Sequence, residues 1–107
     1  MTIDYFIKSK SKQLAFYVRA FWRRQINYAE LDLYFWDTME EWNHIKFDAS
    51  APYSHKERVF WHLLHQIHFW PEAKLLTDKY LRSELETCMG YLEGEGQIPL
   101  DCVGVRP

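Results

Sequence analysis

The apolar residues of this chain repeat at intervals of three and four positions over most of its length, and this spacing restricts the fold more than any other feature. The clearest run is Tyr28, Leu31, Phe35, Thr38, Trp42 and Ile45. An α-helix has 3.6 residues per turn, so such a run lies on one helical face. No stretch shows the sustained alternation of a strand, and the chain has only four Gly and four Pro. The sequence therefore predicts an all-α protein.

Capping and turn residues divide the chain into four predicted helices, at about residues 3–25, 28–46, 55–69 and 72–93. Asn27 with Glu30, and Ser54 with Glu57, have the spacing of a capping box. Pro71 ends or redirects the third helix, and the fourth helix has a possible break near residues 77–78.

We expect one domain, residues 1–107, folded as an up-and-down four-helix bundle, because short links between amphipathic helices favour antiparallel neighbours. Residues 94–107 have no helical period and should form an extended C-terminal tail, anchored by Ile98, Leu100 and Val103. The residues predicted to be buried together are Leu31, Phe35, Trp42, Leu63, Ile67, Leu81 and Leu85.

The dipeptide Phe-Trp occurs four times, although adjacent helical residues point about 100° apart and cannot both enter the core. Helical wheels place five large apolar residues outside the predicted core stripes: Phe16, Leu33, Trp36, Trp61 and Phe69. Single exposed apolar residues are ordinary, and the tail or loops could cover them. The other interpretation is a contact surface, since aromatic residues and arginine are enriched at protein interfaces.

Charge is distributed unevenly along the chain. Residues 1–26 carry a net charge of +5 and residues 27–50 a net charge of −5, while the whole chain has −2. A basic stripe on the first helix comprises Lys8, Lys12, Phe16, Arg19 and Arg23. Its aromatic residue is compatible with nucleic-acid binding, but the sequence pI of about 6.2 and the acidic second helix favour a solvated or intramolecularly paired stripe. The two oppositely charged faces could also meet between subunits.

Three histidines, His62, His65 and His68, follow one another on the third helix. Metal ligands can have this spacing, and Glu57 or Glu84 could complete a site, but the sequence has no HExxH motif and no second helix with matching ligands. We therefore predict no metal at these histidines.

The two cysteines, Cys88 and Cys102, form no CxxC or metal-finger pattern and are typical of reduced intracellular thiols. Cys88 falls on the predicted core stripe, where a thiol behaves as a small apolar group. No Gly-rich phosphate loop precedes a helix, and neither thiol has a base visible in the sequence, so nothing indicates catalysis.

These observations predict a small cytoplasmic, non-catalytic module that binds another protein, which could be a second copy of itself. The longest uncharged stretch, residues 59–71, is too short to span a membrane, and no membrane partner or cofactor is expected. The predicted partner-binding residues are Phe16, Arg19, Arg23, Leu33, Trp36, Trp61, His65, His68 and Phe69. The alternative is a metal- or small-ligand-binding bundle that uses the histidine-rich face of the third helix.

Overall fold

The fold is described by a computed structural model, which covers residues 2–94, 96–99, 102 and 104–107. Within these ranges the regular structure is entirely helical, which confirms the all-α prediction. The helices are α1 (Ile3–Trp22), α2 (Tyr28–Asn43), α3 (His55–Phe69), α4 (Glu72–Thr77) and α5 (Lys79–Leu92). None of these helices is long and apolar enough to cross a membrane.

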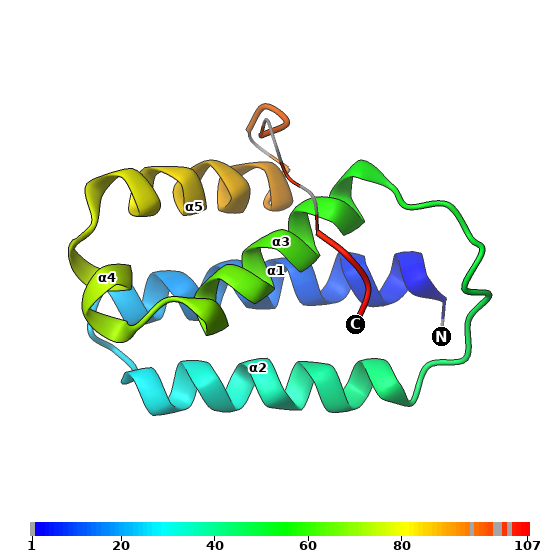
Figure 1. The fold of residues 1–107 in the computed structure, drawn as a ribbon, viewed down its shortest axis with the longest axis horizontal. Coiled ribbons are helices and arrows are strands. Elements are labelled where there is room, and N and C mark those ends of the chain that lie inside the picture. Colours follow the sequence, from blue (N-terminus) through cyan, green and yellow to red (C-terminus); the bar gives the residue numbers. More distant parts are fainter. Residues whose placement is uncertain (1, 95, 100–101, 103) are drawn as a thin grey trace.

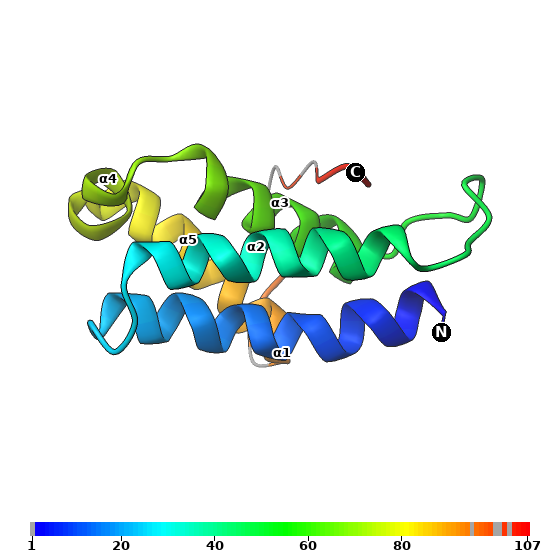
Figure 2. The same cartoon turned by 90° about the horizontal axis from the view of Figure 1, so that it is seen from below.

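The four longer helices are arranged with α1 and α3 in the middle and α2 and α5 on either side (Figure 1). Each of the two central helices contacts the other, and both contact α2 and α5. Figure 2 shows α1 and α2 side by side along their length. In sequence order the four longer helices run in alternating directions along the 39 Å long axis, with short α4 joining α3 to α5. This arrangement leaves α2 and α5 each with a wide outer face.

Local backbone chemistry explains where the helices differ from the predicted bounds. The predicted fourth helix is two helices, and the break lies at the possible break predicted near residues 77–78. Asp78 adopts an extended conformation there, and its carboxylate caps α5 by accepting a hydrogen bond from the Leu81 N–H at 2.9 Å. Helix α1 ends three residues earlier than predicted, since Arg24 has a φ of 60° that cannot continue a right-handed helix. Helix α2 likewise ends at Asn43.

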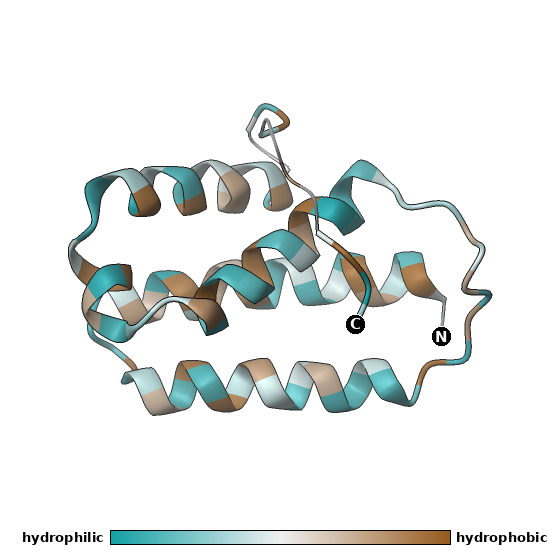
Figure 3. Ribbon diagram, viewed as in Figure 1, coloured by the Kyte–Doolittle hydropathy of each residue, from teal (hydrophilic) through white to brown (hydrophobic). Residues whose placement is uncertain are grey.

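The core lies where the helical spacing predicts it. All seven residues expected to be buried together are buried, and Figure 3 shows the apolar and polar residues that alternate along each long helix. Four rings at the centre come from three helices: Phe6 from α1, Trp42 from α2, and Phe60 and Trp61 from α3. The Trp42 and Trp61 centroids are 4.9 Å apart with the rings nearly perpendicular, a favoured edge-to-face geometry.

The C-terminal tail is held differently from the prediction. Ile98 is half exposed and is therefore no anchor, while Leu100 and Val103 lie outside the described residues. Residues 104–107 instead lie against α3 (Figure 1). A Cβ on Gly104 would overlap the Arg58 carbonyl oxygen and the His62 amide nitrogen, so only glycine permits this approach of the tail to the helix backbone.

Candidate functional site

Four of the five apolar residues predicted to lie outside the core are exposed, and the fifth is not. Phe16, Leu33, Trp36 and Phe69 each expose more than half of their surface. Trp61 exposes 0%, so the prediction that it belongs to an outer surface is wrong. The wheel misplaced Trp61, because its ring packs against Phe6 of α1 and Trp42 of α2 in the core. The C-terminal tail adds further cover, since Gly104 lies against the Trp61 Cβ.

A buried ion pair holds the tail against α3, and it lies beside the Trp61 indole. The Arg106 guanidinium donates to both carboxylate oxygens of Glu57, at 2.5 and 2.8 Å, and the Trp61 indole N–H donates to the same carboxylate at 2.9 Å. Only 6% of the Arg106 side chain and 2% of the Glu57 side chain are exposed. We call Glu57, Trp61 and Arg106 the tail latch.

The loop before α3 completes the surroundings of Arg106. The guanidinium also donates to the Ala51 carbonyl oxygen at 2.9 Å and lies over the Tyr53 ring, 4.1 Å from its centroid. The Tyr53 hydroxyl accepts a hydrogen bond from the Arg106 backbone N–H at 2.9 Å. Ser54 caps α3 through the Glu57 N–H as predicted, but the Glu57 carboxylate serves the tail latch and so does not behave as the reciprocal half of a capping box.

The outer face of α2 brings several predicted contact residues together. We define this α2 outer face as Leu33, Trp36, Asp37 and Glu40, all exposed and on one side of the helix. At its edge, the Trp36 ring packs against the His68 ring of α3, with centroids 5.3 Å apart. His68 Nδ1 lies 3.2 Å from an Asp32 carboxylate oxygen, so a histidine–aspartate contact borders the exposed indole.

The charged residues of α1 divide into paired and unpaired groups. Arg19 donates to Glu93 and Glu86 of the α5 region at 2.6 and 2.8 Å. The hydrogen bond to Glu93, and to a smaller extent the one to Glu86, raises the pKa of Arg19 above its ordinary value. Arg19 is thus committed within the subunit rather than presented to a partner. The other members of the basic stripe, Lys8, Lys12, Phe16 and Arg23, are exposed, and none of the three cations makes an ion pair within the described residues.

The three histidines of α3 point to different neighbours. His62 Nε2 lies 2.9 Å from a Glu84 oxygen on α5, and His68 faces Asp32 on α2. His65 is half buried, and its Nδ1 donates to the Trp61 carbonyl oxygen at 2.7 Å, since a carbonyl can only accept. These three side chains therefore build no common site.

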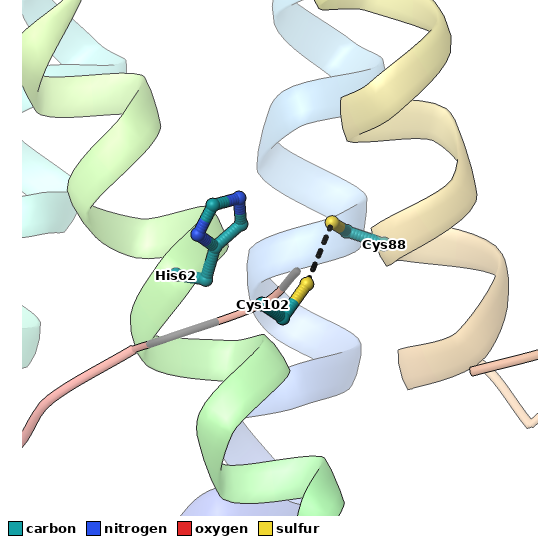
Figure 4. Close-up of side chains that lie close together, drawn as sticks. All are labelled: His62, Cys88 and Cys102. Carbon is teal, nitrogen blue, oxygen red and sulfur yellow. Dashed lines mark hydrogen bonds between the residues drawn. The ribbon is translucent and has the colours of Figure 1, made fainter. Parts of the chain in front are cut away.

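His62 does converge with the two cysteines, which the sequence did not indicate (Figure 4). One ligand atom from each of His62, Cys88 and Cys102 lies within 4.8 Å of the others, and the two sulfur atoms are 4.0 Å apart. We call these residues the thiol–imidazole cluster. Burial, with smaller contributions from Cys102 and Glu84, raises the pKa of Cys88 above its ordinary range, so without a nearby cation its thiol is protonated and a poor nucleophile at neutral pH.

A shallow depression of about 450 Å³ opens beside His62, between α3 and the tail. Its lining includes His62, His65, Gln66 and residues 104–107. The imidazole of His62 therefore borders both this depression and the two thiols.

Comparisons of this chain with protein-family models, with curated proteins and with solved structures find no match. The features that carry a functional interpretation are thus the basic stripe, the α2 outer face, the tail latch and the thiol–imidazole cluster. Only the first two were indicated by the sequence.

Proposed function

We propose that the protein is a non-catalytic interaction module whose α2 outer face docks a basic, apolar-bearing surface, and that a second copy of the chain supplies that surface through its basic stripe. The observation that carries this proposal is the exposure of Trp36: 54% of a large indole is in solvent, beside Leu33 and between acidic residues. Burying such a side chain at the centre of an interface contributes about 2 kcal/mol or more.

Charge supports the second copy as the partner. The α2 outer face carries Asp37 and Glu40, and the basic stripe carries Lys8 and Lys12, with no ion pair to any of these four residues among the described parts of the chain. The two faces lie on neighbouring helices, and their opposite charges are unpaired within the subunit. In a twofold dimer, the basic stripe of each subunit can therefore meet the α2 outer face of the other. Phe16, near the middle of the stripe, then supplies apolar surface opposite Leu33 and Trp36.

The dimensions favour a reversible dimer over a permanent one. Helix α1 has 20 residues and is therefore about 30 Å long, with α2 slightly shorter. Two such helices side by side present a face of about 600 Å² per subunit, near the lower end of specific interfaces. We expect association that depends on protein concentration and weakens toward 1 M salt, where charge screening acts over about 3 Å.

We also propose the topology of the helices, the single domain and the cellular location. The alternating directions of the four longer helices support an up-and-down four-helix bundle forming one domain, with α4 as a helical link. A cytoplasmic location is supported by the 4.0 Å separation of the two sulfur atoms, which are not joined in a disulfide.

Charge reversal on each face tests the proposal. We expect the wild type to dimerise in sedimentation-velocity experiments, and expect K8E/K12E and D37K/E40K each to remain monomeric because like charges then face each other. An equimolar mixture of the two variants should dimerise again, since every contact between the two different chains is attractive. A wild type that stays monomeric at millimolar concentration, or a mixture that fails to associate, would contradict self-association.

The aromatic contribution has its own test and control. Trp36→Ala should weaken dimerisation about 30-fold or more, the equivalent of about 2 kcal/mol, at unchanged melting temperature. Tyr80→Ala is the matched control, because Tyr80 is an exposed aromatic residue on α5, on the other side of the central helices. Equal effects of the two substitutions would show that the α2 outer face has no special role.

A further inference from the structure

We propose that the thiol–imidazole cluster is a zinc site, in which Cys88, Cys102 and His62 bind Zn²⁺ and Glu84 supplies the fourth ligand. The site is independent of the proposed dimer surface. Its ligands come from α3, α5 and the C-terminal tail, and Figure 4 shows the three clustered side chains converging on the space between α3 and α5.

The separation of the sulfur atoms fits a metal better than a disulfide. Two thiolates bound tetrahedrally to Zn²⁺ at 2.3 Å lie about 3.8 Å apart, and the observed separation is 4.0 Å. A disulfide requires about 2.05 Å, so the sulfur atoms would have to approach by roughly half of their present separation. A histidine nitrogen and a sulfur bound to one zinc lie about 3.6 Å apart. The three ligand atoms here lie at most 4.8 Å from one another, so a small side-chain movement brings them to that distance.

Glu84 is placed to complete a tetrahedron. It precedes Cys88 by four residues on α5, so both side chains project from the same face of that helix. Its carboxylate oxygen lies 2.9 Å from His62 Nε2, and about half of its side chain is exposed, which leaves it free to turn toward a metal. On zinc binding, metal bonds to the imidazole and the carboxylate replace this hydrogen bond.

The chemistry of the donor set favours zinc over Mg²⁺ and Ca²⁺. Two soft thiolates with one imidazole are unsuited to Mg²⁺ or Ca²⁺, which prefer oxygen ligands. Two cysteines and one histidine with a fourth ligand form a known type of tetrahedral zinc site. Binding releases the two thiol protons to solvent and leaves two thiolates. The two positive charges of Zn²⁺ neutralise these thiolates, so that no uncompensated negative charge remains at the buried Cys88.

The site would also fasten the tail. Cys102 is the tail's ligand, and Arg106 of the tail latch follows it by four residues and pairs with Glu57 of α3. Zinc would therefore link α5, α3 and the tail and stabilise the folded state by mass action.

Titration of untagged, fully reduced protein with Co²⁺ under anaerobic conditions tests the assignment, because Co²⁺ occupies zinc sites and shows thiolate-to-cobalt charge-transfer absorption. We expect one Co²⁺ per chain, displaced by one equivalent of Zn²⁺. Cys102→Ser and His62→Gln should abolish this absorption or weaken binding at least 100-fold, and Glu84→Gln should weaken binding about 10- to 100-fold. His65→Gln is the matched control, since His65 lines the same depression but lies outside the cluster, and it should bind as the wild type does.

Reduced protein that shows no thiolate–cobalt absorption overturns the assignment, and so does binding that survives Cys102→Ser or is lost in His65→Gln. Formation of a Cys88–Cys102 disulfide by protein that binds no metal when reduced would identify a redox pair instead and also overturn it. Because His62→Gln could impair folding, thermal melting of the wild type provides a second measurement: one equivalent of Zn²⁺ should raise the melting temperature of the wild type and leave that of Cys102→Ser unchanged.

Discussion

The tail latch yields the sharpest quantitative prediction about stability. Replacing Arg106 with alanine removes the cation from a pair in which both side chains are almost fully buried. The Glu57 carboxylate then retains only the indole N–H of Trp61 among its side-chain donors in the latch. Removing one partner of a buried ion pair costs about 3 to 5 kcal/mol, because the remaining charge is neither hydrated nor neutralised.

The position of Arg106 in the tail limits this cost. If residues 104–107 leave α3, water reaches Glu57 and its charge is hydrated again, at the expense of the tail contacts. We therefore expect Arg106→Ala to lower the free energy of unfolding by about 3 kcal/mol, the lower end of that range. This loss corresponds to a decrease in melting temperature of roughly 12 °C for a domain of about 100 residues.

Urea denaturation followed by circular dichroism measures this loss. Arg106→Lys should fall between wild type and alanine, because an ammonium keeps the charge but cannot donate to both carboxylate oxygens and to Ala51 in the same fork geometry. Glu57→Gln in the Arg106→Ala background should recover part of the loss, since it removes the buried charge. Lys79→Ala is the control, because Lys79 is exposed on α5, away from the proposed dimer surface, and makes no ion pair in the described structure. A loss below about 1 kcal/mol for Arg106→Ala would refute the buried latch.

Two further predictions concern the core and a helix cap. Trp42→Ala should cost about 3 to 5 kcal/mol in urea denaturation, because the ring is 2% exposed and packs against Phe6 and Trp61, and unchanged stability would contradict this core. The hydrogen bond from the Leu81 N–H lowers the pKa of Asp78 in the folded protein. The cap's contribution to stability is therefore complete above the ordinary carboxyl pKa of about 4, and it is lost as the pH falls through the lower pKa of the folded state. The difference in melting temperature between wild type and Asp78→Ala should therefore shrink between pH 7 and pH 2, and a constant difference would exclude this titration.

Local sequence patterns predicted the helices and the centre of the core well. Spacings of three and four residues depend only on helical geometry, so the burial of Leu31, Phe35 and Trp42 followed directly from them. The Ser54 cap is equally local, because its hydroxyl accepts from an N–H three residues away. The exposure of Phe16 and Trp36 also followed from the wheel, since no other segment of the described structure covers them.

The remaining features depend on contacts between residues far apart in the chain, and only the tertiary structure decided them. Trp61 lies outside the main apolar stripe of α3, and it is buried because Phe6 of α1 and Trp42 of α2 pack against its ring. Glu57 is buried beside it because Arg106, 49 residues later in the chain, pairs with its carboxylate. His62 meets Cys88 and Cys102 for a similar reason: α5 packs beside α3, and the tail returns across it. A helical wheel contains one segment at a time, so it determines which face of a helix is apolar but not which distant charge or thiol that face will meet.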